Sequence, residues 1–195
     1  MQINKKDVYF ITSVSLVFCT ISAILSFTGM FLPGKILLNP IAISLNAKEV
    51  AGHFVWGLVA GAATFRVKYA LLGGSFAVLI DSDHLIALLQ TEAIPRMSHS
   101  IIFAAISAIV LMAIFGKRDY ILGIIAATSV ATHISYDIFN GGSGFPLFTP
   151  FLNSILSFPK MDWIFFEIAA IIIIAVVTFL VKRKEFAEKQ KVSQK

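Results

Sequence analysis

Charged residues are scarce in this chain, where they make up 14% of the residues against about a quarter in soluble globular domains. Hydrophobic residues make up 57%, and apolar stretches of about 20 residues, long enough to cross a bilayer, recur along the sequence. This shortage of charge excludes a soluble domain and predicts a polytopic membrane protein. Linkers, low-complexity segments and internal repeats are also lacking, so residues 1–195 are expected to form a single domain.

Cysteine is almost absent. The single Cys19 lies in an apolar stretch, so an internal disulfide and a cysteine-ligated metal cluster are both excluded. The net charge is +5, and much of it comes from residues 182–195, which contain six Lys and Arg residues. We expect this segment to be a basic cytoplasmic tail near anionic lipid headgroups, and we expect no nucleic-acid binding.

The apolar stretches predict an all-α bundle of about six transmembrane helices. They cover residues 8–31, 49–65, 69–90, 99–115, 119–139 and 162–181. The first stretch follows Lys5 and Lys6 and is too long for the apolar part of a signal peptide. It also lacks a small-x-small cleavage site, so we interpret it as an uncleaved anchor.

The distribution of Lys and Arg predicts the orientation of the bundle. Short cytoplasmic loops retain positive charge, and six spans with both termini inside place twelve of the sixteen Lys and Arg residues in the cytoplasm. The four on the other side are Lys35, Lys48, Arg96 and Lys160. Both termini are therefore predicted to be cytoplasmic, in a multi-pass protein of the cell (plasma or inner) membrane.

Two carboxylates and an imidazole interrupt the third apolar stretch, at Asp81, Asp83 and His84. Ionisable groups inside a span are costly and typically mark a functional site. Asp81 and His84 share a helix face, as do His133 and Asp137 in the fifth stretch. A rise of 1.5 Å per residue places these two pairs about 18 to 27 Å from the cytoplasmic ends of their helices. Both pairs are therefore expected in the outer third of the bundle.

The other two histidines, His53 and His99, open the second and fourth stretches from the outer side, so all four imidazoles should gather at one depth. Together with three aspartates they give seven candidate metal ligands: His53, Asp81, Asp83, His84, His99, His133 and Asp137. This set of nitrogen and oxygen donors suits a divalent metal ion, zinc before calcium or magnesium. Seven ligands exceed one tetrahedral site, so one or two ions bind per chain, or some of the seven orient ligands or act in catalysis. The alternative is a network of hydrogen bonds between helices.

Arg96 is the only basic residue expected near this cluster. It either extends to a lipid headgroup or binds an anionic substrate group such as a phosphate. Ser98 is a candidate N-cap for the fourth span. Glu167, about 8 Å into the sixth span, either joins the polar network or extends to the interface.

Two further features bear on packing and access. Gly57 and Gly61 form a small-xxx-small pair, which predicts a close approach of a neighbouring helix. The stretch 140–151, rich in turn-forming and aromatic residues, predicts an external loop within residues 140–161. Because this loop follows His133 and Asp137 directly, it is placed to cover the outer mouth of the bundle or to dip into the interface.

The order of these motifs resembles the YdjM-like family of inner-membrane proteins classed as metal-dependent hydrolases. The resemblance covers residues from about 50 to 181. It is carried by His53, the D-x-D-H of Asp81 to His84, the R-x-x-H-S of Arg96 to Ser100, the H-x-x-x-D of His133 to Asp137, and the G-x-P-L-x-x-P-F of Gly144 to Phe151. Ile80 stands where the family usually has Pro, and Ser98 where it usually has Thr. The resemblance implies a helical membrane protein with hydrolase activity and carries the functional roles to His53, Asp81, Asp83, His84, Arg96, His99, His133 and Asp137.

The sequence thus favours a membrane-embedded, metal-dependent hydrolase whose site lies at the extracytoplasmic edge of the bundle. Asp83 or Asp137 would act as base or orienting group, and Arg96 would hold negative charge. The location suggests an amphiphilic or lipid-linked ester or phosphoester as substrate, and membrane lipids as neighbours. Two alternatives use the same cluster: a divalent metal or proton transporter, and a non-catalytic membrane protein with a structural metal ion. The oligomeric state is left open.

Overall fold

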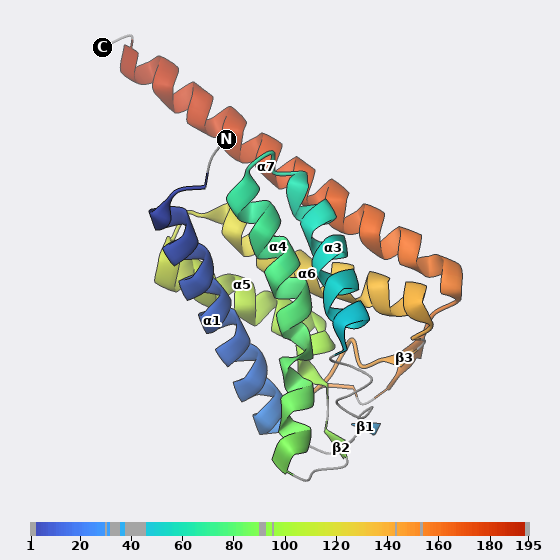
Figure 1. Ribbon diagram of the computed structural model, residues 1–195. Coiled ribbons are helices and arrows are strands. Elements are labelled where there is room, and N and C mark those ends of the chain that lie inside the picture. The colour runs from blue at the N-terminus through green and yellow to red at the C-terminus, as the bar shows by residue number, and fades with distance from the viewer. Residues whose placement is uncertain are drawn as a thin grey trace.

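The computed structural model describes residues 3–29, 31, 36–37, 46–89, 93–94, 96–142, 144–152 and 154–193. Within these residues the chain is all-α, as predicted (Figure 1). Its six α-helices are α1 (Lys5–Gly29), α3 (Ala47–Ala62), α4 (Val67–Leu79), α5 (Ile101–Phe115), α6 (Tyr120–Asn140) and α7 (Trp163–Ser193). Each of them falls on one of the six apolar stretches.

Three helical segments in the described part of the chain are long and apolar enough to cross a membrane. They are Lys5–Gly29, Tyr120–Asn140 and Lys160–Ser193. Helices α3, α4 and α5 are shorter, with 16, 13 and 15 residues, below the usual range of about 17 to 25. Transmembrane helices are therefore present, and the number of six complete spans stays a prediction.

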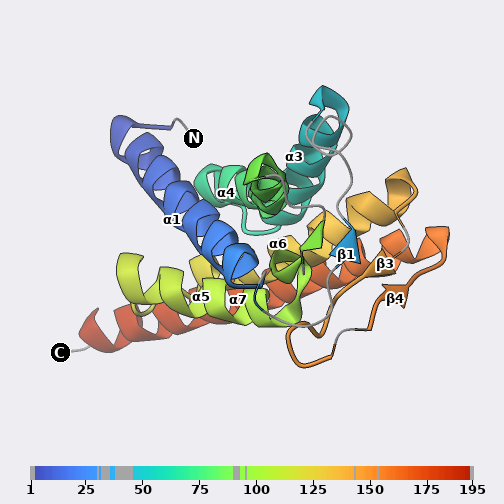
Figure 2. The same cartoon turned by 90° about the horizontal axis from the view of Figure 1, so that it is seen from below.

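Helix α6 is the central element of the bundle. It packs against α3, α4, α5 and α7, and the view along the bundle shows it between these neighbours (Figure 2). In its most apolar segment 78% of the residues are buried, against 22% in those of α1 and α7. The outer helices expose apolar side chains such as Leu16, Ile24 and Phe179, which suits a surface covered by lipid hydrocarbon.

Helices α3 and α4 pack with their backbones in contact. A Cβ atom added to Gly57 would overlap the carbonyl oxygen of Gly73 and would lie 2.8 Å from the Cβ of Ala77. A Cβ at Gly61 would lie 2.8 Å from the carbonyl oxygen of Tyr69. The close approach predicted from the small-xxx-small pair is confirmed, and it brings His53 on α3 beside the chain that follows α4.

The start of α1, the α3–α4 turn and the end of α7 lie at one end of the bundle (Figure 1). Lys68 lies 4.9 Å above the ring of Phe10, and Lys182 lies 5.3 Å above the ring of Phe65. The start of α1 and the end of α7 therefore lie at the same end of the bundle. Which face of the membrane this end occupies stays a prediction.

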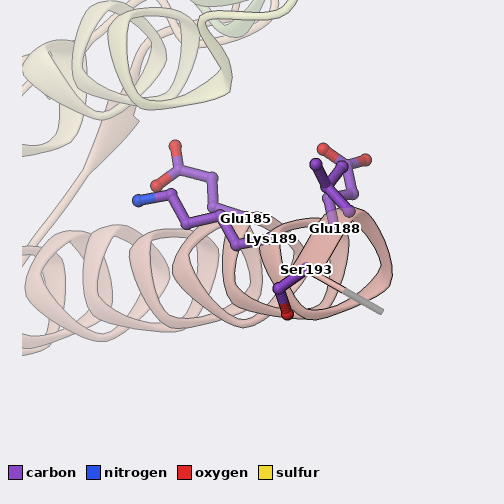
Figure 3. Close-up of a pocket in the computed structure, with 5 residues that line it drawn as sticks. Glu185, Glu188, Lys189 and Ser193 are labelled. Atoms are coloured by element: carbon purple, nitrogen blue, oxygen red, sulfur yellow. The ribbon is translucent and has the colours of Figure 1, made fainter. Parts of the chain in front are cut away.

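The basic segment after residue 181 continues α7 as an exposed helix to Ser193, while Lys195 lies outside the described residues. Beside it lies a hollow of about 420 Å³, lined by Glu185, Glu188, Lys189, Val192 and Ser193 (Figure 3). All of these side chains come from α7 alone. Because an open hollow beside one helix gives a ligand no opposing wall, this hollow is not a candidate site.

Two short antiparallel strand pairs lie at the opposite end of the bundle. Strand β1 (Ile36–Leu37) pairs with β2 (Ala93–Ile94), and β3 (Gly144–Phe145) pairs with β4 (Leu156–Ser157). The backbone N–H of Ile101 donates to the carbonyl of Leu147 at 2.9 Å, which fixes the segment after β3 to the start of α5. Part of the predicted external loop is therefore held against the bundle.

Candidate metal centre

The D-x-D-H segment lies in a 3₁₀ helix, η1 (Ile80–Leu89), and not in the straight α-helix predicted over residues 69–90. Contacts with α1 accompany this change: the Ser22 hydroxyl donates to the carbonyl of Ile80 at 3.3 Å, and the Ser82 hydroxyl donates to Ser22 at 3.0 Å. A 3₁₀ helix has three residues per turn, so Asp81 and His84 stand directly above one another. The prediction that these two share a face holds, with a different geometry.

Five side chains from four elements converge at the end of α6 opposite the termini. The His133 Nε2 atom lies 3.4 Å from an oxygen of Asp81 and 3.3 Å from an oxygen of Asp137. The His53 Nε2 atom lies 3.4 Å and 3.3 Å from oxygens of the same two carboxylates. His99 completes the group, with its Nε2 atom 2.9 Å from that of His133. We refer to His53, Asp81, His99, His133 and Asp137 as the central cluster.

The spacing of these atoms fits a divalent metal ion better than a set of direct hydrogen bonds. Hydrogen bonds between nitrogen and oxygen usually measure about 2.7 to 3.2 Å, and the four distances from His53 and His133 to the two carboxylates are longer. Ligand atoms arranged as a tetrahedron around zinc, at bonds of about 2.0 to 2.1 Å, lie about 3.4 Å apart. The spacing of these nitrogen and oxygen atoms therefore fits the ligand shell of a divalent metal ion.

Hydrogen bonds at the far side of two imidazoles set which nitrogen faces the cluster. The Nδ1–H of His133 donates to the carbonyl of Ala77 at 2.7 Å, so in the neutral imidazole its Nε2 carries the lone pair. His99 Nδ1 lies 3.0 Å from the Ser98 hydroxyl, which itself donates to Asp83 at 2.7 Å. The Nε2 of His99 is thereby also an acceptor. Two acceptors 2.9 Å apart need a cation or a donor beside them. The guanidinium of Arg96 contacts Nε2 of His99, which leaves Nε2 of His133 as the acceptor that faces the two carboxylates.

Arg96 points into the cluster and not toward the headgroups. Its Nη2 atom lies 3.4 Å from Asp81 and contacts the Nε2 atom of His99, and its Nε atom lies 3.7 Å from Asp83. Only 14% of its side chain is exposed. Arg96 therefore does not extend to a lipid headgroup in the structure, and its binding of an anionic substrate group stays a prediction.

Ser98 is not the N-cap of the fourth predicted span, and His99 is not in an α-helix. Residues Met97–His99 form a 3₁₀ turn, η2, and Ser100 caps α5 by accepting a hydrogen bond from the N–H of Phe103 at 3.1 Å. The Ser98 hydroxyl instead donates to Asp83, which is completely buried. Because the cap falls two residues later, Ser98 is free to support the carboxylate beside His99.

Residues 48–192 match the YdjM inner membrane protein family. The chain belongs to this family. The resemblance drawn from the ordered motifs is thus confirmed, and the matched region contains every residue of the central cluster together with Asp83, His84 and Arg96. No curated protein and no solved structure matches the chain.

Membership in the YdjM family, together with the apolar helices, makes this chain a membrane protein. Helix α1 precedes the matched residues. Nevertheless its Ser22 is hydrogen-bonded to both sequence neighbours of Asp81, since it donates to the carbonyl of Ile80 and accepts from the hydroxyl of Ser82. In this YdjM protein the D-x-D-H motif is therefore supported by a helix outside the residues that match the family.

Tyr136 is a neighbour of the centre that sequence reasoning missed. Its ring stands edge-on to that of His53, with centroids 4.6 Å apart, and its hydroxyl donates to the carbonyl of Lys48 at 3.3 Å. Any side chain at Gly52 would overlap the Tyr136 ring. Its position in the sequence, next to Asp137 and about one helical turn after His133, could have indicated that it lies near the centre.

Glu167 has no hydrogen bond to the cluster among the residues that the structure describes. It is 7% exposed on α7, so it does not extend to the interface either. The hydroxyl of the neighbouring Ser135 donates to the carbonyl of Trp163 at 2.9 Å. Neither interpretation of Glu167 is supported, and its burial outside the cluster makes it a suitable control position.

Two side chains of the site are partly exposed, one from the central cluster and one beside it. Asp137 is 19% exposed and Arg96 is 14% exposed, whereas the other carboxylates and imidazoles of the site are at most 6% exposed. A ligand from outside would therefore meet Asp137 and Arg96 first. In this YdjM protein the residues 144–152 lie next to the start of α5, and their action as a cover of the site stays a prediction.

Proposed function

We propose that this YdjM protein is a membrane-embedded hydrolase that depends on a divalent metal ion, most suitably zinc. The observation that supports this is the convergence of three imidazoles and two carboxylates at distances that match a ligand shell, inside a bundle where unpaired polar groups are costly. The ion would be held by the three imidazoles and Asp81 of the central cluster, which leaves Asp137 beside it. Once bound, it would lower the pKa of a water molecule toward about 7 and polarise the bond to be cut.

The side chains around the ion take distinct roles in this proposal. Asp137, the most exposed carboxylate of the site, accepts the proton of the attacking water. Asp83 lies 3.3 Å from Nδ1 of His99 and accepts a hydrogen bond from Ser98, whose hydroxyl lies 3.0 Å from the same nitrogen. Asp83 so keeps Nε2 of His99 directed at the cluster. Arg96 supplies a positive charge at the accessible side and binds a negative group of the substrate.

The surroundings favour an amphiphilic substrate, such as a lipid-linked ester or phosphoester. The segment that follows α6 exposes apolar side chains at Phe148, Phe151, Leu152 and Ile155. Such side chains, beside a polar site at one end of a membrane bundle, suit the boundary between hydrocarbon and water. A substrate with a hydrocarbon chain and a polar head would lie across this boundary.

Transport of a metal ion or a proton is the main alternative, and the interior of the bundle argues against it. Beneath the cluster the space between α3, α4, α6 and α7 has no volume for a water molecule. The hydroxyls of Thr128 and Ser129 that face this space donate to carbonyls of their own helix at 2.7 Å. Among the described residues, this space therefore offers no water-filled path from the cluster to the other end.

The hydrolase proposal is tested on the purified full-length protein in detergent. We expect a transition metal to copurify, and we expect cleavage of an alkyl nitrophenyl phosphate in mixed micelles. A chelator should abolish this cleavage and zinc should restore it. Glu167→Gln, which changes a buried carboxylate outside the cluster, should keep both metal and activity. If no transition metal copurifies and added zinc neither binds nor raises the melting temperature, the proposal is wrong.

A structural metal ion is distinguished by Asp137→Asn. This change keeps the shape of the side chain and weakens it as a proton acceptor, so we expect the fold and much of the metal to remain while cleavage of the same probe falls by about 10²-fold or more. Unfolding of this variant with loss of all metal, while the wild type cleaves nothing, would favour the structural alternative.

The extracytoplasmic location of the site is tested by labelling single cysteines in whole cells. In a Cys19→Ala background, Ser154→Cys places a thiol at an exposed position near β4. We expect a membrane-impermeant maleimide to label it from outside, since loops with few Lys and Arg face away from the cytoplasm. Gln190→Cys at the other end should be labelled only after lysis, and the reverse pattern would invert the orientation.

A further inference from the structure

A second group of donors adjoins the central cluster. The Nε2 atom of His84 lies 3.5 Å from an oxygen of Asp81 and 3.7 Å from Oδ1 of Asp83. The side chains of His84, Asp81 and Asp83 are 2%, 6% and 0% exposed. These three residues come from one 3₁₀ turn, and their ligand atoms lie within 4.8 Å of one another.

Two buried atoms of this group lack hydrogen bonds within the described part of the chain. They are Oδ1 of Asp83 and Nδ1 of His84. Oδ2 of Asp83 is engaged by Ser98 and His99, so Oδ1 is the free end of a carboxylate that is otherwise well held. A buried, charged oxygen without a partner is strongly unfavourable. It faces Nε2 of His84 at 3.7 Å, which is too long for a hydrogen bond, so a cation between these two atoms would give the oxygen a partner.

Asp81 stands between the two groups. Its Oδ2 atom lies 3.4 Å from Nε2 of His53 in the central cluster, and its Oδ1 atom lies 3.5 Å from Nε2 of His84. Oδ1 also lies 3.4 Å from Nε2 of His133. One carboxylate thus presents its two oxygens to histidines of both groups, as a bridging ligand between two metal ions does.

We propose that the centre holds two divalent ions, with Asp81 as the shared ligand and Asp83 and His84 as the further ligands of the second ion. This inference rests on the proposed function and extends it to the substrate class. Two-metal sites stabilise both the attacking and the leaving oxygen of a displacement at phosphorus. Two divalent ions and Arg96 outweigh the three carboxylates in charge, so the occupied site attracts an anionic phosphoester over a neutral carboxylic ester.

The number of ions per chain tests this proposal directly. Elemental analysis of the purified full-length protein, reconstituted with zinc and freed of excess metal, should give two ions per chain. His84→Ala should give one, because the central cluster is left intact, and Glu167→Gln should keep two. One ion per chain in the wild type, or two in His84→Ala, would overturn the second site.

A second measurement covers the case in which His84→Ala fails to fold. The wild-type protein loaded with manganese alone should give the electron paramagnetic resonance spectrum of an exchange-coupled pair of ions. A spectrum of isolated ions at full loading contradicts the proposal. The hydrolase can fail separately: without any bound metal both proposals are wrong, whereas one ion with intact cleavage removes only the second site.

Discussion

The His133→Ala variant is expected to lose the metal ion of the central cluster and at least about a thousandfold of its hydrolytic rate. His133 is the imidazole closest to the rest of the central cluster, with Nε2 3.4 Å from Asp81, 3.3 Å from Asp137 and 2.9 Å from His99. A bound metal ion contributes several kcal/mol of transition-state stabilisation, and about 1.4 kcal/mol corresponds to a factor of ten in rate.

The measurement combines metal content with the rate of cleavage of the alkyl nitrophenyl phosphate. Thr132→Val is the matched control, since Thr132 is the preceding residue of α6 and, within the described residues, its hydroxyl donates only to the carbonyl of Ser129, at 3.0 Å. We expect this control to retain metal and activity. A His133→Ala protein that keeps its metal and cleaves the probe at the wild-type rate would exclude the central cluster as the active site.

Two physical rules made it possible to predict from the sequence alone which residues meet. Ionisable side chains inside apolar stretches have to find one another, and the rise per residue gives the depth at which they do so. His53, Asp81, His99, His133 and Asp137 could therefore be grouped from their positions alone, and the structure brings all five together.

The local geometry of the site was not predictable from spacing, because it depends on contacts between distant segments. The 3₁₀ turn around Asp81 is bonded to Ser22, 58 residues before Ile80. The role of Ser98 depends on Asp83 lying beside it, 15 residues earlier. The periodicity of a stretch indicates which face it buries, but it does not indicate which hydroxyl of another segment lies opposite that face. The supporting roles of Ser22 and Ser98 could therefore be identified only from the structure.

The direction of the Arg96 side chain is another feature that the sequence alone could not decide. As one residue in a loop it was equally suited to a headgroup and to a buried anion. Its contacts with Asp81, Asp83 and His99 place it among three groups from η1 and η2. A guanidinium there compensates carboxylates that a membrane interior would otherwise destabilise, and its remaining exposure leaves it within reach of a substrate.

Replacing Gly57 with valine is expected to destabilise the whole bundle, in contrast to the local effect of changing a metal ligand. The Cβ atom of valine would overlap the backbone carbonyl of Gly73, which no side-chain rotation can relieve. Helices α3 and α4 would have to move apart, and His53 would be displaced from Asp81 and Asp137 with them. Because overpacking of a tight contact typically costs about 1 to 3 kcal/mol when flexible side chains can adjust, we expect a loss of at least about 3 kcal/mol at this backbone contact.

Thermal unfolding in detergent measures this effect, and metal content measures its consequence for the site. A loss of about 3 kcal/mol corresponds to a melting temperature about 6 to 12 °C lower for a chain of this size, and the fraction that remains folded should bind less metal. Ala62→Val adds methyl groups at an exposed position of the same helix and should change neither quantity. Equal melting temperatures for Gly57→Val and Ala62→Val would mean that α3 and α4 are not held in contact at Gly57 and Gly73. The position of His53 would then need another explanation, because that contact is what aligns α3 with the segment carrying Asp81.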